Sequence, residues 1–177
     1  EYKAYLMEGV RPQTWYNHRN GHWIVENDWP KKIINSTWKF RADGALSNLE
    51  EGQSDLGIKI SSPQDCGIES GEYCAIWLGA EMPGDQQIDD SKSICFTSPV
   101  LSENLDIVGA PNIHLSISSD KPAAQIAVRL NHIHPDGAST RITYGVFNLA
   151  HRKGSEMTTL LSPGEVFDVD FSLDQIA

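Results

Sequence analysis

The sequence has little of what would mark a disulfide-rich, metal-binding or membrane protein. It holds only three cysteines, Cys66, Cys74 and Cys95, and their spacing matches neither C-x-x-C nor a zinc-binding pattern. An odd number of irregularly spaced cysteines indicates neither a disulfide framework nor a metal site. Apolar runs are short beside the roughly 20 residues of a membrane-spanning helix, and no signal-peptide pattern opens the chain. We therefore expect no metal or cofactor, no membrane partner and a cytoplasmic location.

Basic residues are also scarce. Lys and Arg number 14 against 24 Asp and Glu, which gives a formal net charge of −10. Such a chain repels polyanions, and no basic stripe interleaved with aromatic residues opposes that repulsion, so we expect no nucleic-acid partner. The rest of the composition, 40% hydrophobic and 21% charged, is typical of a globular protein, and 177 residues suit one domain.

Helical periodicity is missing, and strand periodicity takes its place. Short alternating segments recur between turn signals such as Asp43-Gly44 and Pro135-Asp136-Gly137. Each segment has one apolar and one polar face, so seven or eight of them predict an all-β sandwich or jelly roll. The run Tyr73–Leu78 is apolar throughout and predicts a strand buried on both faces. The clearest alternating positions are Ile113, Leu115 and Ile117; Ile126, Val128 and Leu130; and Phe167, Val169, Phe171 and Leu173.

The first 35 residues differ from the rest of the chain. They hold three of the five tryptophans, Trp15, Trp23 and Trp29, and show little strict alternation. We expect a loop-rich aromatic segment here. Its rings have to be buried, either against the sandwich of the same chain or in an interface with a neighbouring domain.

No residue pattern indicates catalysis by this chain. An α/β-type serine hydrolase needs a G-x-S-x-G elbow followed by a helix, and the sequence has neither. His132 and His134 share one strand face, as a metal-dependent jelly roll would require, but no nearby Glu completes a ligand set. Asp85, Asp89 and Asp90 do not match a calcium-binding loop, so turn-forming and capping roles are the default for them. We predict no catalytic residue and no metal ligand.

A succession of motifs resembles one known family. The run Met82–Gln87, followed by Asp89 and Asp90, resembles the P-x-D-Q-R element in the C-terminal domain of the X-Pro dipeptidyl-peptidase, cocaine esterase and α-amino-acid ester hydrolase family. Gln87 departs from the pattern, because the family usually has Arg there. Other segments match in order and cover nearly the whole chain: Phe96–Leu101, Val108–Pro111, Ser118–Asp120, Val128–Leu130, Pro135–Gly137, Thr143–Gly145, Asn148–Arg152 and Pro163–Glu165.

The resemblance implies a jelly-roll β-sandwich, galactose-binding-like, that assists a serine hydrolase and is not itself catalytic. In the family the Ser-His-Asp triad lies in an α/β-hydrolase domain N-terminal to the sandwich, and that domain is the implied partner. The sandwich would stabilise the enzyme and shape one side of its active-site cleft. Ile76, Trp77 and Leu78 precede the D-Q element, and they either face the acyl pocket or fill a buried strand. The implied structural motif residues are Asp85, Gln86, Pro135, Asp136 and Gly137.

The resemblance also predicts how the chain is divided. Residues 1–35 are expected to form a linker segment between the hydrolase domain and the sandwich, and residues 36–177 the sandwich itself. The family's next strand, G-H-R-I-R-L, is absent from the sequence, so the sandwich would lack its last strand or strands. We expect the chain either to self-associate through the exposed sheet edge or to fill the gap with its own aromatic N-terminal segment. Two rival hypotheses remain, a stand-alone carbohydrate-binding module that uses its tryptophans, and a metal-dependent jelly-roll enzyme.

Overall fold

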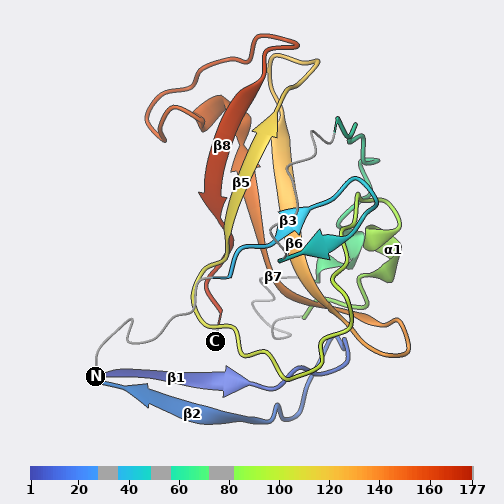
Figure 1. Ribbon diagram of the computed structural model, residues 1–177, viewed down its shortest axis with the longest axis vertical. Coiled ribbons are helices and arrows are strands. Elements are labelled where there is room, and N and C mark those ends of the chain that lie inside the picture. Colours follow the sequence, from blue (N-terminus) through green and yellow to red (C-terminus); the bar gives the residue numbers. More distant parts are fainter. Residues whose placement is uncertain (28–35, 49–56, 72–81, 177) are drawn as a thin grey trace, which may run out of the picture. The chain divides into compact units, whose positions relative to one another are not determined.

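The structure of the chain, a computed structural model, describes residues 1–27, 36–48, 57–71 and 82–176 (Figure 1). Strands are the main regular structure in these residues, and helix is confined to short turns, so the predicted all-β class is confirmed. Within the same ranges, none of the helices has the length and apolar character needed to cross a bilayer. The strands are β1 (Tyr2–Met7), β2 (Gly21–Glu26), β3 (Lys39–Phe40), β4 (Leu46–Ser47), β5 (Asn112–Ile117), β6 (Gln125–Ile133), β7 (Ser139–Asn148) and β8 (Phe167–Ser172). The helical turns are α1 (Gln87–Asp90) and the 3₁₀ turns η1 (Ile68–Ser70) and η2 (Leu149–His151).

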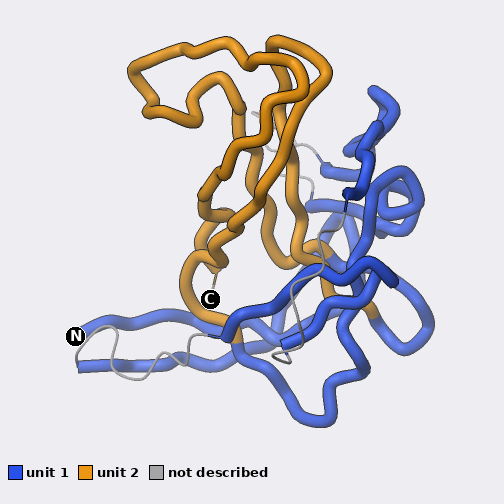
Figure 2. The backbone as a smooth tube through the Cα atoms, turned by 45° about the horizontal axis from the view of Figure 1, so that its top comes forward, with its two compact units in different colours: residues 1–106, 134–140 blue, residues 107–133, 141–177 orange. Residues whose placement is uncertain are grey.

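The chain divides into two compact units, shown in different colours in Figure 2. Unit 1 comprises Glu1–Asp106 and His134–Thr140, and unit 2 comprises Ile107–Ile133 and Arg141–Ala177. This grouping reports compactness within the chain, and the boundary expected between residues 35 and 36 stays a prediction. The strand expected over Tyr73–Leu78 lies outside the described residues.

In unit 1 the N-terminal segment forms a hairpin. β1 and β2 pair in antiparallel fashion, from Tyr2 opposite Glu26 to Met7 opposite Gly21, and residues 8–20 between them contain no strand (Figure 1). Ala4 and Leu6 are buried. Residues two apart in a strand share a face, so these two small and aliphatic side chains supply the period-two pattern that the aromatic residues around them obscure.

The Asp43-Gly44 turn predicted from the sequence is confirmed in unit 1. It joins β3 to β4, and Gly44 has a φ of 82°, a left-handed conformation that favours glycine. The Asp43 carboxylate accepts a hydrogen bond from the Ala45 N–H at 3.1 Å. Asp and Gly therefore each have a definite function at this turn.

Unit 2 is built around one hydrophobic core. Its sheets are two-stranded, β5 paired with β8 in antiparallel fashion and β6 paired with β7, and side chains from all four strands pack together. The Phe147 and Phe171 rings, from β7 and β8, stack with centroids 5.1 Å apart. The core contains Leu149, Leu161 and Val169, packed by Leu115, Ile117, Ala124, Ile126, Phe147, Phe167 and Phe171.

The alternation read from the sequence holds in the paired strands of unit 2. Along β5 and β8 the apolar side chains are buried or half-buried, and the polar ones between them are exposed. The strand predicted at 166–173 is confirmed as β8, and Leu173, which follows it, is buried. Gly145 of β7 faces Leu173, where an added Cβ would lie 3.0 Å from Leu173 Cδ2 and 3.2 Å from its Cα. Only glycine allows this close approach without displacing β8.

On the outer side of the β5–β8 pair, His114 and Asp170 are opposite residues in the register. The His114 Nδ1 and Asp170 Oδ1 atoms are 2.8 Å apart, and this hydrogen bond raises the pKa of His114 above its ordinary value. Both side chains are largely exposed, so water and salt weaken the pair. It is a surface contact between two exposed side chains.

Candidate functional site: a polar cluster in unit 1

The D-Q element begins α1 in unit 1. The Asp85 carboxylate accepts hydrogen bonds from the Gln87 N–H at 3.1 Å and from the Gln87 Nε2 amide at 3.2 Å. The first contact is an Asx turn, which directs the backbone into the helical turn that follows. At the position where the family usually has Arg, this chain therefore has a neutral amide that bonds to the preceding carboxylate.

Asp85 and Gln86 are joined to a segment some fifty residues away in sequence. The Ser139 N–H donates to Asp85 Oδ1 at 3.0 Å, and the Gln86 N–H donates to the Ser139 carbonyl at 3.0 Å. The Ser139 hydroxyl donates to Asp90 Oδ2 at 2.7 Å. We call Asp85, Gln86, Asp89, Asp90 and Ser139 the polar cluster. Gln86, Asp89 and Ser139 are completely buried, so these hydrogen bonds replace contacts with water.

The Gln86 side chain holds two neighbouring carbonyl groups. Its Nε2 donates to the Glu69 carbonyl at 2.8 Å and to the Gly84 carbonyl at 3.0 Å. Its Oε1 is buried and has no hydrogen-bond partner among the described residues. A buried acceptor of this kind is commonly satisfied by a bound water molecule.

Asp89 stabilises the 3₁₀ turn η1. Its Oδ1 accepts from the Gly67 N–H at 2.8 Å and its Oδ2 accepts from the Glu69 N–H at 3.1 Å. A carboxylate that receives two backbone N–H groups satisfies donors that a short helical turn leaves without intrahelical partners. The capping role expected for these aspartates fits this geometry, but its target about twenty residues earlier could not be read from the sequence.

The Pro135-Asp136-Gly137 turn lies beside Ser139. The His134 N–H donates to the Ala138 carbonyl at 2.8 Å, and Gly137 takes a φ of 91°. The Asp136 carboxylate pairs with the Arg11 guanidinium and accepts from the Ala138 N–H. Desolvation raises the pKa of Asp136, but the Ala138 N–H and the Arg11 charge outweigh it and hold this pKa below its ordinary value.

A second contact connects the same turn to the N-terminal segment. The Thr140 hydroxyl donates to the Val10 carbonyl at 2.8 Å, and His134 Nε2 lies 2.9 Å from Thr140 Oγ1. His134 is thus engaged in a side-chain hydrogen bond, and no group of three His, Cys, Asp or Glu residues that could hold a metal occurs in the described ranges. Ser139 and Thr140 were missed by sequence reasoning, and their only signal was their position directly after the turn.

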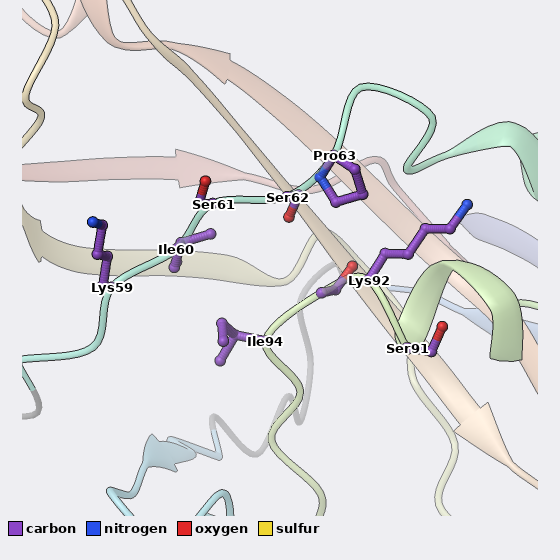
Figure 3. A pocket seen from close by; sticks show the side chains of 9 residues that line it. Lys59, Ile60, Ser61, Ser62, Pro63, Ser91, Lys92 and Ile94 are labelled. Carbon is purple, nitrogen blue, oxygen red and sulfur yellow. The ribbon is translucent and has the colours of Figure 1, made fainter.

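The proposed pocket-facing residues Ile76, Trp77 and Leu78 lie outside the described residues, so their orientation stays a prediction. The described part of unit 1 has a shallow cavity of about 530 Å³ between residues 59–63 and 91–94 (Figure 3). Lys59 and Lys92 lie at its two ends and do not converge. The Lys92 ammonium is bound to Asp65 at 2.7 Å. This cavity therefore lacks a convergent set of polar groups that would fix a ligand.

Fold and cluster together define an all-β domain in which buried polar side chains hold distant segments to one another. The chain belongs to the X-Pro dipeptidyl-peptidase C-terminal non-catalytic domain family, whose model matches residues 3–177. The family predicted from the motifs is confirmed by this match.

Two known proteins show the same relationship. The chain is 23% identical over 167 residues to cocaine esterase from Rhodococcus sp. (strain MB1 Bresler), in a match that covers 88% of this chain and 29% of the esterase. A solved structure of an α-amino acid ester hydrolase, labelled with selenomethionine, is similar in fold with a TM-score of 0.64 at 18% identity. That match again covers 88% of this chain and 29% of the other. The chain therefore spans under a third of each relative.

Proposed function

We propose that this chain is the C-terminal accessory domain of an α/β-hydrolase-type serine hydrolase, either an X-Pro dipeptidyl-peptidase or an acyl-ester hydrolase. In that role it stabilises the enzyme and shapes one side of its active-site cleft. The observation that carries the proposal is the family match over residues 3–177, in a chain that spans 29% of each relative. The family match also favours this function over a carbohydrate-binding module or a metal-dependent enzyme, because the family is described as non-catalytic and peptidase-associated.

The polar cluster supports the stabilising part of the proposal. Hydrogen bonds to a charged group contribute about 1.5–3 kcal/mol each, and a buried carboxylate without its partners costs more. Asp85 and Asp89 accept such bonds from three separate segments of unit 1. These contacts hold the segments of unit 1 in a fixed arrangement, which a wall of an active-site cleft needs.

The test compares the full-length gene product with residues 1–177 alone. A fluorophosphonate probe should label a serine of the full-length protein and none in residues 1–177, because the probe needs a serine activated by a neighbouring base. The full-length protein should also hydrolyse p-nitrophenyl esters or X-Pro anilides, and residues 1–177 should hydrolyse neither, since removing a triad lowers kcat by a factor of about 10⁶. Stoichiometric labelling of the short chain, or an unlabelled full-length protein, would contradict the proposal.

We also propose that the chain, when separated from the hydrolase, self-associates. Among the described strands every sheet is a two-stranded pair, and an open sheet edge is a template for another chain. Tyr144 and Val146, which are exposed on the outer face of β7, add apolar surface that favours association.

A further inference from the structure

Both faces of the β1–β2 hairpin carry apolar side chains. On one face Ala4 and Leu6 are buried. On the other face Met7, Trp23 and Val25 keep 45%, 68% and 53% of their surface exposed. A two-stranded hairpin is marginally stable by itself, and an amphipathic one normally presents polar side chains to water. An apolar outer face therefore marks this hairpin as a surface that another element covers.

The register places these side chains together. Tyr5 is opposite Trp23, Lys3 is opposite Val25, and Met7 is opposite Gly21, so all of them project from the same side of the hairpin. We call Lys3, Tyr5, Met7, Trp23 and Val25 the outer hairpin face. The Tyr5 and Trp23 rings meet edge to face with centroids 5.4 Å apart. The Lys3 ammonium is 2.9 Å from a Glu1 carboxylate oxygen, which balances the charge of the face.

This composition is that of an interface. Trp, Tyr and Met are enriched in the cores of protein–protein interfaces, and unpaired charges are depleted there. The Tyr5–Trp23 contact also arranges the rings in advance, which lowers the entropy lost when a partner binds.

We propose that the outer hairpin face docks onto the catalytic part of the same full-length chain, an inference that rests on the proposed function. The family is a C-terminal domain, so in its members the larger part of the chain precedes the matched segment. Such a preceding part lies N-terminal to the hairpin, because β1 is the first strand of the matched segment (Figure 1). The hairpin therefore comes first in the sequence after that part, and a covalent connection gives it a high effective concentration toward the catalytic surface.

A second copy of the chain is the less suitable occupant. Two copies that each carry a net charge of −10 repel one another, and the outer hairpin face offers no unpaired charge to offset that repulsion. A covalently connected domain binds without the entropy cost of a bimolecular association.

Hydroxyl-radical footprinting of the full-length protein tests the docking without any substitution. Met7 is compared with Met157, a methionine of unit 2 that is 63% exposed, so residue type is matched. The exposed fractions alone, 63% against 45%, explain a ratio of only about 1.4 in labelling rate. If the face is docked, Met7 should be labelled at least about threefold more slowly than Met157, with Trp23 protected alongside it. A smaller ratio would overturn the inference.

A matched pair of variants identifies the occupant. Val25→Lys in the full-length protein should raise the labelling rate of Met7 at least about threefold, whereas Val166→Lys, at a site 67% exposed in unit 2, should leave it unchanged. If Val25→Lys fails to fold, the wild-type comparison still decides. Protection that disappears on dilution would assign the face to a second copy and overturn the inference.

Fluorophosphonate labelling of the same preparation separates the two proposals. A labelled serine with a freely accessible Met7 defeats only the docking inference. A protected Met7 in a full-length protein without a labelled serine supports docking onto the preceding chain and defeats only the hydrolase assignment.

Discussion

At the scale of residues, buried polar side chains decide how unit 1 is held together. Asp85 was recognised from its motif, whereas Ser139 has no motif of its own and supplies three hydrogen bonds to the cluster. One completely buried serine thus connects the D-Q element to the turn at residues 134–138. The contribution of Ser139 to the polar cluster is evident only from its burial and its hydrogen-bond partners. A serine after a turn is too common in sequences to predict such a role.

Asp89 offers the sharpest single substitution. Asp89→Asn should lower the free energy of unfolding by about 2 kcal/mol, because it removes the charge from two hydrogen bonds and turns an amide N–H toward a backbone donor. Urea unfolding of wild type and variant measures the change. Asp120→Asn, the same replacement at a side chain 87% exposed, should change it by less than about 0.5 kcal/mol. Equal effects of the two substitutions would show that the buried contacts of Asp89 add nothing.

At the scale of elements, β7 presents two different faces. Thr143, Gly145 and Phe147 turn toward the interior of unit 2, whereas Tyr144 and Val146 are exposed between them. Strand periodicity makes this division, since successive side chains point to opposite faces. The outer face therefore combines an aromatic and a β-branched side chain where polar residues are usual.

We expect the isolated chain to self-associate through this strand face and the sheet edges. In sedimentation velocity, the average mass of residues 1–177 should rise with concentration, and rise further with salt, which screens the −10 charges beyond about 8 Å at physiological strength. Val146→Lys should weaken association, and Val166→Lys serves as the control. A monomer at every concentration and salt level would contradict self-association. If the N-terminal segment were also protease-sensitive, and therefore not packed into the gap, both alternatives would be wrong.

At the scale of the whole molecule, the central question is whether this domain forms a wall of the active-site cleft. In the full-length protein, Trp77→Ala should change the ratio of kcat/KM values for two acyl substrates more than it changes stability. A core position would instead lose about 3–5 kcal/mol on removal of the ring. Phe147→Ala, within the unit 2 core, is the control that should lower stability and leave the kcat/KM ratio unchanged. A Trp77 variant that behaves like Phe147→Ala would contradict the cleft-shaping role.

The described structure confirms those predictions that depend on neighbouring residues. Strand β8 was expected at 166–173 and occurs at Phe167–Ser172, and the Asp43-Gly44 turn is formed. Both depend on short-range rules, period two in a strand and the conformational freedom of glycine in a turn. The N-terminal hairpin was not predicted, because aromatic side chains on both faces of its strands conceal the alternation on which such a prediction depends.

The sequence by itself determined the all-β class, the family and the absence of a nucleophile elbow, because each is a pattern of residue types at short spacing. Only the tertiary structure decided that Asp85 and Gln86 form hydrogen bonds with Ser139, and that the Asp89 carboxylate accepts one from the Gly67 N–H. These contacts join residues some twenty to fifty positions apart. Which partner a polar side chain bonds at such a sequence separation depends on how the intervening chain folds into loops. That folding depends on the packing of many residues, so no short motif predicts it.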